Sequence, residues 1–170
     1  MKTALTCNDP VLFLEHKNLM AMKGPVPEPE DDYYIPFGQA RIAREGKDVT
    51  VVALTLMVRK TLEAAEALAK EGISVEVIDP RTVSPLDTDT ILESVKKTGR
   101  LLVIDESFQP CGIGAEIAAQ IMDKGFDELD APVRRMNGGF TPTPYSPSLE
   151  AAIVPNPKTI AQAIRDLIKE

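Results

Sequence analysis

The sequence predicts an α/β protein of three layers, in which helices cover both faces of a five-stranded, mixed and mostly parallel sheet. Short β-branched apolar runs alternate with stretches of helical periodicity along most of the 170 residues. Alternation of this kind implies parallel strands joined by crossover helices. A tight turn between the first two strands of the main body predicts that this pair is antiparallel, which adds one antiparallel edge strand. The length fits one domain around one core.

The N-terminal part of the chain differs in composition from the rest. Residues 11–15 (Val-Leu-Phe-Leu-Glu) are mostly apolar and follow the turn signal at residues 8–10, so they predict a buried strand. Three prolines and four acids fall within residues 23–32, which predicts an extended linker or surface arm rather than a core element. Residues 39–44 then predict an edge strand, and residues 45–48 the tight turn that follows it.

The main body continues as strands and helices in turn. The β-branched run at 49–54 predicts an interior strand, and further strands are predicted at 75–78 and at the apolar run 101–104, with a last strand at 132–136. Helices are predicted by apolar residues at helical spacing, at 57–70, from a start at 84–87 to Gly99, at 113–124, and after the cap Asn156-Pro157. Residues 138–147 are rich in Gly, Pro and Thr and predict a loop.

Composition excludes several classes of function. The net charge of −7 repels phosphate backbones, so nucleic acid is not expected as a partner. The same acidity suits either a basic protein partner or plain solubility. No apolar run approaches the roughly 20 residues of a membrane span, and the N-terminus lacks the pattern of a signal peptide. The expected location is the cytoplasm.

Charged residues follow two of the predicted strands. Asp79 and Arg81 come after one strand, and Asp105 and Glu106 come after another. Ligands of open parallel sheets bind at the carboxyl ends of strands, so these four side chains could form a rim for a ligand or a neighbouring subunit. The alternative is a structural cluster of carboxylate–guanidinium pairs that fixes the strand-to-helix loops.

Residues 112–115 (Gly-Ile-Gly-Ala) open a predicted helix after a strand, as a dinucleotide-binding loop does. The third glycine of that motif is replaced by Ile117, and the connection from Asp105 to Pro110 is too long for its tight turn. Close packing or an unusual backbone angle explains Gly112 and Gly114 better, although the helix N-terminus could still hold an anion.

No complete catalytic constellation is visible in the sequence. His16 is the single histidine and has no Ser or Cys nucleophile beside it, so it is either a general base or a strand-end residue at an interface. Cys7 and Cys111 form no CxxC pair. The sequence also lacks GxxxxGK[ST], HExxH, GxSxG and a GDG motif with a downstream Asn. The chain is therefore expected to work as part of a larger enzyme.

Several segments together resemble a known family. They are residues 9–17 (DPVLFLEHK), 23–27 (KGPVP), 34–40 (YIPFGQA), 77–87 (VIDPRTVSPLD), 97–101 (KTGRL) and 141–147 (TPTPYSP). These segments resemble the β subunit of thiamine-diphosphate-dependent 2-oxoacid dehydrogenases, the E1 component, and pyruvate and acetoin dehydrogenase β subunits look most similar. Cys111 before Gly112 favours the acetoin type.

The resemblance implies a domain organisation and a set of partners. Residues 1–16 would be the end of a pyrimidine-binding domain, 17–37 a linker, and 38–170 a transketolase C-terminal-like domain that supports subunit assembly. Its partners would be the E1 α subunit, a second β subunit and the E2 acyltransferase core, with a homodimer expected for the isolated chain.

The resemblance also implies which functional residues are missing. Thiamine diphosphate and Mg²⁺ would belong to the complete enzyme, so this chain alone would bind neither and would be inactive, with no catalytic residue of its own. A structural cation is implied near Ala4, Leu5, Cys7 and Asp9, although Cys7 stands where relatives often have an acid. The alternative function is a stand-alone regulatory module that binds a small molecule at the charged rim.

Overall fold

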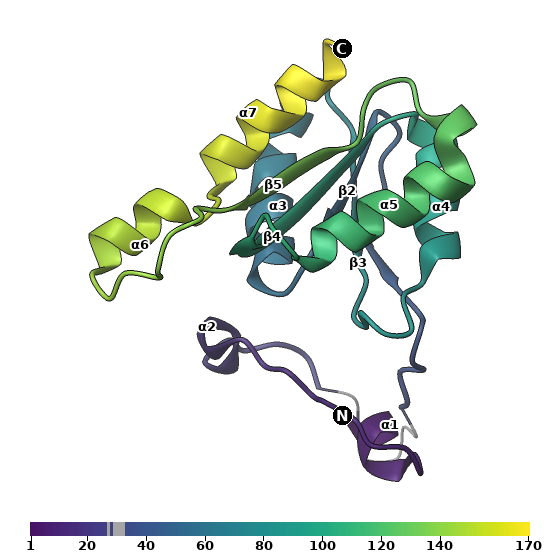
Figure 1. Ribbon diagram of the computed structural model, residues 1–170, viewed down its shortest axis with the longest axis vertical. Helices are drawn as coiled ribbons and strands as arrows, with labels where there is room; N and C mark the ends of the chain where they lie inside the picture. Colours follow the sequence, from purple (N-terminus) through teal and green to yellow (C-terminus); the bar gives the residue numbers. More distant parts are fainter. Residues whose placement is uncertain (27, 29–32) are drawn as a thin grey trace.

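A computed structural model of the chain describes residues 1–26, 28 and 33–170 (Figure 1). A five-stranded sheet has the order β1-β3-β2-β4-β5. The edge strand β1 pairs antiparallel with β3, and all other pairs are parallel. The strand bounds are β1 Arg41–Arg44, β2 Val49–Ala53, β3 Val75–Asp79, β4 Leu101–Phe108 and β5 Arg134–Gly138. The predicted mixed sheet with one antiparallel edge strand is confirmed.

Helices cover both faces of this sheet (Figure 1). Helices α3 (Leu56–Ala69) and α7 (Pro157–Ile168) pack on one face, and α4 (Thr88–Thr98) and α5 (Ile113–Gly125) on the other. The central strand β2 is buried on both sides, so its side chains divide between the two layers. Val51 packs in the core with α3 and α7, whereas Val52 packs in the core with α4 and α5.

Local signals fix the ends of the helices. Asp87 caps α4 by accepting a hydrogen bond from the Thr90 N–H, and Gly99 ends the helix with a left-handed φ of 67°. Asn156 caps α7 through a capping box, with Pro157 in the first turn. Helix α4 therefore begins at Thr88, slightly later than the predicted start at residues 84–87.

The predicted pairing of the first two body strands is wrong. Strand β1 lies beside β3 instead of β2. The reason is that every residue of β2 is buried, so this strand takes the centre of the sheet and uses both its edges for β3 and β4. The connection between β1 and β2 passes over the start of β3 at Gly46, where an added Cβ would lie 2.1 Å from the Glu76 amide nitrogen.

The predicted buried strand at residues 11–15 is also wrong. These residues form no strand and are exposed, with 93% of Leu12 and 83% of Leu14 accessible. A strand needs an edge to pair with, and this segment pairs with none of the described strands. The short helices α1 (Lys2–Thr6) and α2 (Lys17–Met20) flank it, and α1 lies away from the sheet in Figure 1.

Two further elements complete the described chain. The helix α6 (Pro147–Ile153), which was not predicted, follows the expected loop and projects from the domain, and a short 3-10 helix (Phe126–Glu128) follows α5 (Figure 1). Strand β4 extends to Phe108, so Asp105 and Glu106 belong to its last part. Part of the predicted linker, residues 27 and 29–32, lies outside the described residues. Within the described chain no helix has the length and apolar character needed to cross a membrane.

Candidate functional site

The four charged residues predicted to form a rim do not meet in one cluster. Asp79 lines a cleft with residues of one side of α3, and Glu106 lines another cleft with Leu56 and Lys60 from the first turn of the same helix. The start of α3 therefore stands between the two carboxylates. Asp105 lies on the opposite face of the sheet, beside the start of α5.

The cleft beside Asp79 is built by three elements and the N-terminal arm. Strand β1 contributes Arg41, the cross-strand partner of Asp79, and α3 contributes Arg59. The chain after α2 contributes Lys23. Three basic side chains thus line the cleft with one carboxylate.

Asp79 is an unusual acid within this cleft. Burial raises the pKa of its carboxyl, and the Arg81 amide and the charges of Arg81 and Arg41 oppose that change only in part. The Arg81 amide donates a hydrogen bond of 3.1 Å to Asp79 Oδ1. Arg81 itself lies on the loop after β3 with a φ of 58°. The two rim residues of this strand therefore contact each other through the main chain.

The second cleft contains the only histidine. His16 Nε2 lies 2.6 Å from Glu106 Oε1, and its Nδ1 accepts a hydrogen bond of 3.2 Å from the Asn18 amide. Because Nδ1 accepts, the ring proton is on Nε2 and is donated to the carboxylate. Both ring nitrogens thus have hydrogen-bond partners, and His16 connects the N-terminal arm to the domain through Glu106.

The two glycines at the start of α5 differ in how closely they are packed. An added Cβ on Gly112 would lie 2.6 Å from the Phe108 carbonyl oxygen, and one on Gly114 would lie 3.4 Å from a Val103 methyl carbon. Asp105 accepts hydrogen bonds from both the amide and the hydroxyl of Ser107. Close packing therefore explains Gly112, whereas a Cβ on Gly114 would make only an ordinary van der Waals contact.

The residues implied for a structural cation lie in and after α1. The Cys7 thiol is 3.6 Å from the Ala4 carbonyl oxygen and 3.4 Å from that of Asp9, so it faces the oxygens that a cation would use. Leu5 lies one residue on in the same helix. Among the described residues no group of three or more His, Cys, Asp or Glu side chains is placed to hold a metal ion.

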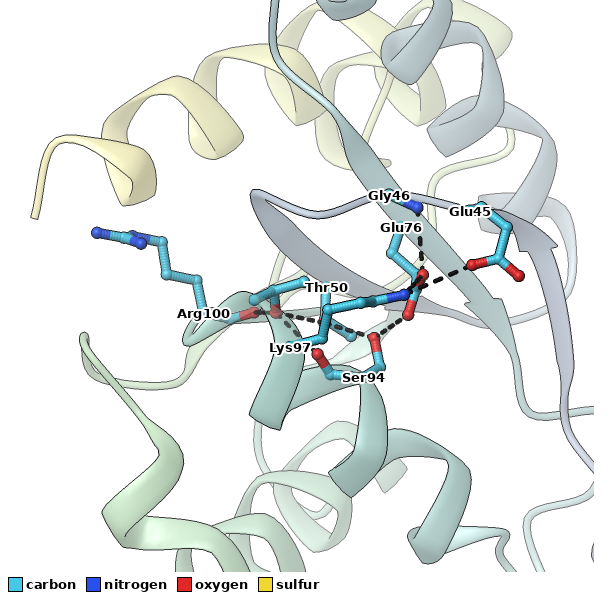
Figure 2. A network of polar contacts seen from close by, with 8 residues as sticks. Glu45, Gly46, Thr50, Glu76, Ser94, Lys97 and Arg100 are labelled. Atoms are coloured by element: carbon cyan, nitrogen blue, oxygen red, sulfur yellow. Dashed lines mark hydrogen bonds and ion pairs between the residues drawn. The ribbon is translucent and has the colours of Figure 1, made fainter.

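A buried polar network between β3 and α4 was not predicted (Figure 2). Glu76 accepts hydrogen bonds from the Gly46 amide, the Ser94 hydroxyl and the Lys97 ammonium. Ser94 and Thr98 both contact the Thr50 hydroxyl, at 2.6 and 2.7 Å. The signal in the sequence was an acid inside the β-branched run of β3, where every neighbour is apolar. The network ties the sheet to α4, and Glu76, Ser94 and Lys97 also line a cleft of about 370 Å³ beside this helix.

The chain is an α/β domain in which the charged residues at the strand ends lie in separate places and form no single site. A family model of the transketolase C-terminal domain matches residues 38–160. The chain belongs to the transketolase C-terminal domain family.

Curated relatives extend the similarity to nearly the whole chain. It is 50% identical over 166 residues to the β subunit of acetoin:2,6-dichlorophenolindophenol oxidoreductase from Cupriavidus necator, covering 98% of this chain and 48% of the relative. The corresponding Bacillus subtilis subunit is 49% identical, with the same two coverages. The mitochondrial pyruvate dehydrogenase E1 β subunit of Dictyostelium discoideum is 44% identical, over 97% of this chain and 47% of the relative. The chain thus spans about half the length of the relatives it matches.

Solved structures agree with this assignment. A structure described as "Split gene transketolase, inactive beta4 tetramer" matches with a TM-score of 0.68 and 27% identity, over 81% of this chain and 44% of the other. A 2-oxoglutarate:ferredoxin oxidoreductase from Magnetococcus marinus matches with a TM-score of 0.53 and 15% identity, over 81% and 20%, which shows a shared fold alone.

Proposed function

We propose that this chain is the C-terminal assembly domain of the E1 β subunit of a thiamine-diphosphate-dependent dehydrogenase of the acetoin or pyruvate type. The observation that carries the proposal is the extent of the similarity. Identity of 44–50% runs along 97–98% of this chain but covers only 47–48% of the relatives. The chain is thus equivalent to one half of a working β subunit.

We further propose that residues 1–16 end the domain that comes before this one in the relatives, that 17–37 are a linker, and that 38–170 are the assembly domain. The support is the state of residues 11–14, which are apolar, extended and exposed. A strand that is separated from its sheet exposes the apolar side chains that the sheet would bury, as Leu12 and Leu14 are exposed here. The upstream domain would supply that sheet.

The proposed role is structural rather than chemical. Cofactor activation would lie with the upstream domain and the α subunit, and this domain would hold the α subunit, a second β subunit and the E2 core together. Thiamine diphosphate, when bound in the complete enzyme, would stabilise the carbanion formed on a 2-oxo substrate or acetoin. We assign no step of that reaction to the residues of this chain.

Self-association of the isolated chain is part of the same proposal. Beyond Leu12 and Leu14, large side chains are exposed near α6, namely Phe140, Tyr145 and Leu149. Apolar patches of this kind drive association. We expect a homodimer, and sedimentation that finds only monomer at micromolar concentration would contradict this. We also propose a cytoplasmic location, because the two bacterial acetoin-type relatives are more similar to the chain than the mitochondrial Dictyostelium subunit is.

Fragment complementation tests the proposed function. The chain is mixed with the α subunit and the N-terminal half of the β subunit of the Cupriavidus relative, with thiamine diphosphate and Mg²⁺, and acetoin-dependent dye reduction is measured. Turnover is expected with all three components and not when the N-terminal half is omitted. Turnover by this chain and the α subunit alone would refute the assembly role.

A pair of variants makes the experiment specific. Replacing Leu12 with Glu places a charge on the segment proposed to enter the upstream sheet, and should abolish complementation without changing the melting temperature of the chain. Val26→Glu is the matched control, because Val26 is 84% exposed and lies in the linker. Equal loss of turnover in both variants would remove the case for a specific contact at Leu12.

A further inference from the structure

Three basic side chains share one cleft and have no partner there. The cleft has a volume of about 390 Å³ and is lined by Lys23, Arg41 and Arg59, together with Asp79. Within the described part of the chain, none of the three cations makes a hydrogen bond or an ion pair. Arg41 stands opposite Asp79 in the β1–β3 pair, yet no ion pair joins their side chains. In a chain with a net charge of −7, three cations that share a cleft with a single carboxylate favour an anionic partner.

The start of α3 adds to the positive potential. The N-terminus of a helix carries partial positive charge and favours anions. Helix α3 has no acidic residue in its first turn, and Arg59 lies in that turn. Thr55, the N-cap, makes no capping hydrogen bond with its side chain and has a φ of 49°. The cleft therefore combines two guanidinium groups and a helix N-terminus without a carboxylate cap.

Asp79 does not neutralise this cluster. Its carboxyl is partly buried where it lines the cleft, which raises its pKa, and one of its oxygens already accepts a hydrogen bond from the Arg81 amide. Arg41 and Arg59 are exposed, so their guanidinium groups can turn toward a ligand at little cost. A guanidinium group matches carboxylate and phosphate oxygens in a bidentate way.

The rest of the lining is apolar and limits the kind of ligand. Leu19 and Met22 come from the α2 side, and Val58 and Leu62 from α3. A volume of this size falls at the lower end of the range for small-molecule sites. An anion with a short apolar body would fit both the charges and the walls.

We propose that this cleft binds a small organic anion, whose carboxylate or phosphate group is held by Arg41 and Arg59 and whose apolar part lies against Val58 and Leu62. Lys23 completes the site from the arm. The site is distinct from the predicted rim, because of its four members only Asp79 lines this cleft. It does not depend on the proposed function, since every residue that carries it lies within this chain.

Calorimetric titration of the full 170-residue chain tests the proposal. The probes are inorganic phosphate, phenyl phosphate, 4-methylpentanoate and, as a neutral match, 4-methylpentanamide. We expect saturable binding of at least one apolar anion, stronger than that of inorganic phosphate, and no binding of the amide. Comparing the affinities for phenyl phosphate and 4-methylpentanoate shows whether the site prefers a phosphate or a carboxylate group. Absence of saturable binding for every anion up to about 10 mM would overturn the proposal.

Variants locate the binding. Arg41→Gln and Arg59→Gln should each weaken the affinity about tenfold, the loss expected for one charge-assisted contact. Lys70→Gln is the matched control, because Lys70 is an exposed cation at the other end of α3 and should leave the affinity within about twofold. Affinities that are equal in wild type and both Arg variants would show that the anions bind elsewhere. A thermal melt confirms that each variant is folded, and the two Arg variants test the site independently.

Discussion

Replacing Glu76 with Gln tests whether the buried network fixes α4 to the sheet. The Glu76 side chain is 1% exposed and interacts with the Gly46 amide, Ser94 and Lys97 (Figure 2). Gln has the same size and still accepts one or two of these hydrogen bonds, but it removes the negative charge. The substitution therefore isolates the electrostatic part of the network from its packing.

The magnitude follows from how each partner is exposed. Removing one member of a buried ion pair costs about 3–5 kcal/mol when the other charge stays buried. Lys97 is 42% exposed and can turn to water, so that penalty is reduced. Loss of the charge-assisted hydrogen bonds remains, and we expect the free energy of unfolding to fall by about 2–3 kcal/mol. For a chain of this size the melting temperature should fall by about 4–12 °C.

The effect should depend on pH in one direction. Burial opposes the charge of Glu76, but the hydrogen bonds from Lys97, Ser94 and the Gly46 amide outweigh it and hold its pKa below the ordinary value. A group whose pKa is lowered by folding stabilises the protein above its unfolded pKa, about 4.3 for Glu, and that contribution disappears as the pH falls through the folded pKa. The difference between wild type and Glu76→Gln should therefore be complete at pH 7 and shrink below about pH 4.

Urea denaturation at pH 7 and at pH 3.5 measures both effects. Glu93→Gln is the matched control on the same helix, since Glu93 forms an exposed pair with Lys96 and its loss should leave the midpoint unchanged within error. If Glu76→Gln shifts the midpoint no more than this control does, the network does not stabilise the fold and the reasoning fails.

Three further substitutions test other parts of the structure. Gly99→Ala should lower the free energy of unfolding by about 1–2 kcal/mol, because Gly99 has a φ of 67° and an added Cβ would meet the Asp130 carboxylate; a melt unchanged from wild type would contradict this. Ile164→Ala should cost about 2–5 kcal/mol in urea denaturation, because Ile164 is fully buried in the core with α3 and α7; a loss below 1 kcal/mol would show that the site collapses. His16→Gln should speed tryptic cleavage in the arm without changing the melt, because it weakens the contact with Glu106; an unchanged cleavage rate would exclude His16 as the link.

The fold could be predicted where local signals and burial agree. The β2 run at residues 49–53 and the Asn156 cap with Pro157 each point to one structure, and the chain adopts it. The partner of β1 could not be read from the short turn, because a strand partner is chosen by competition among all edges of the sheet. Residues 11–15 have the composition of a strand, but composition does not supply an edge to pair with.

The candidate site was harder to predict than the fold. Placing charged residues at strand ends was sound, but the sequence does not show that the first turn of α3 separates Asp79 from Glu106. Arg41 and Arg59 were not singled out, because one lies in an edge strand and the other on a helix, where exposed basic residues are common. A signal was present in the first turn of α3, which contains Arg59 and Lys60 and no acid.

The position of α7 has a consequence for how the chain folds as it is made. Helix α7 covers one face of the sheet with Ile160, Ile164 and Leu167, which are the last apolar residues of the core along the chain. Synthesis proceeds at about 5–20 residues per second, so α7 is made several seconds to tens of seconds after β2. Until then α7 cannot cover its face of the sheet. During that interval an apolar sheet surface is open to water, so ribosome-bound nascent chains that stop before residue 157 should be the species most prone to capture by chaperones.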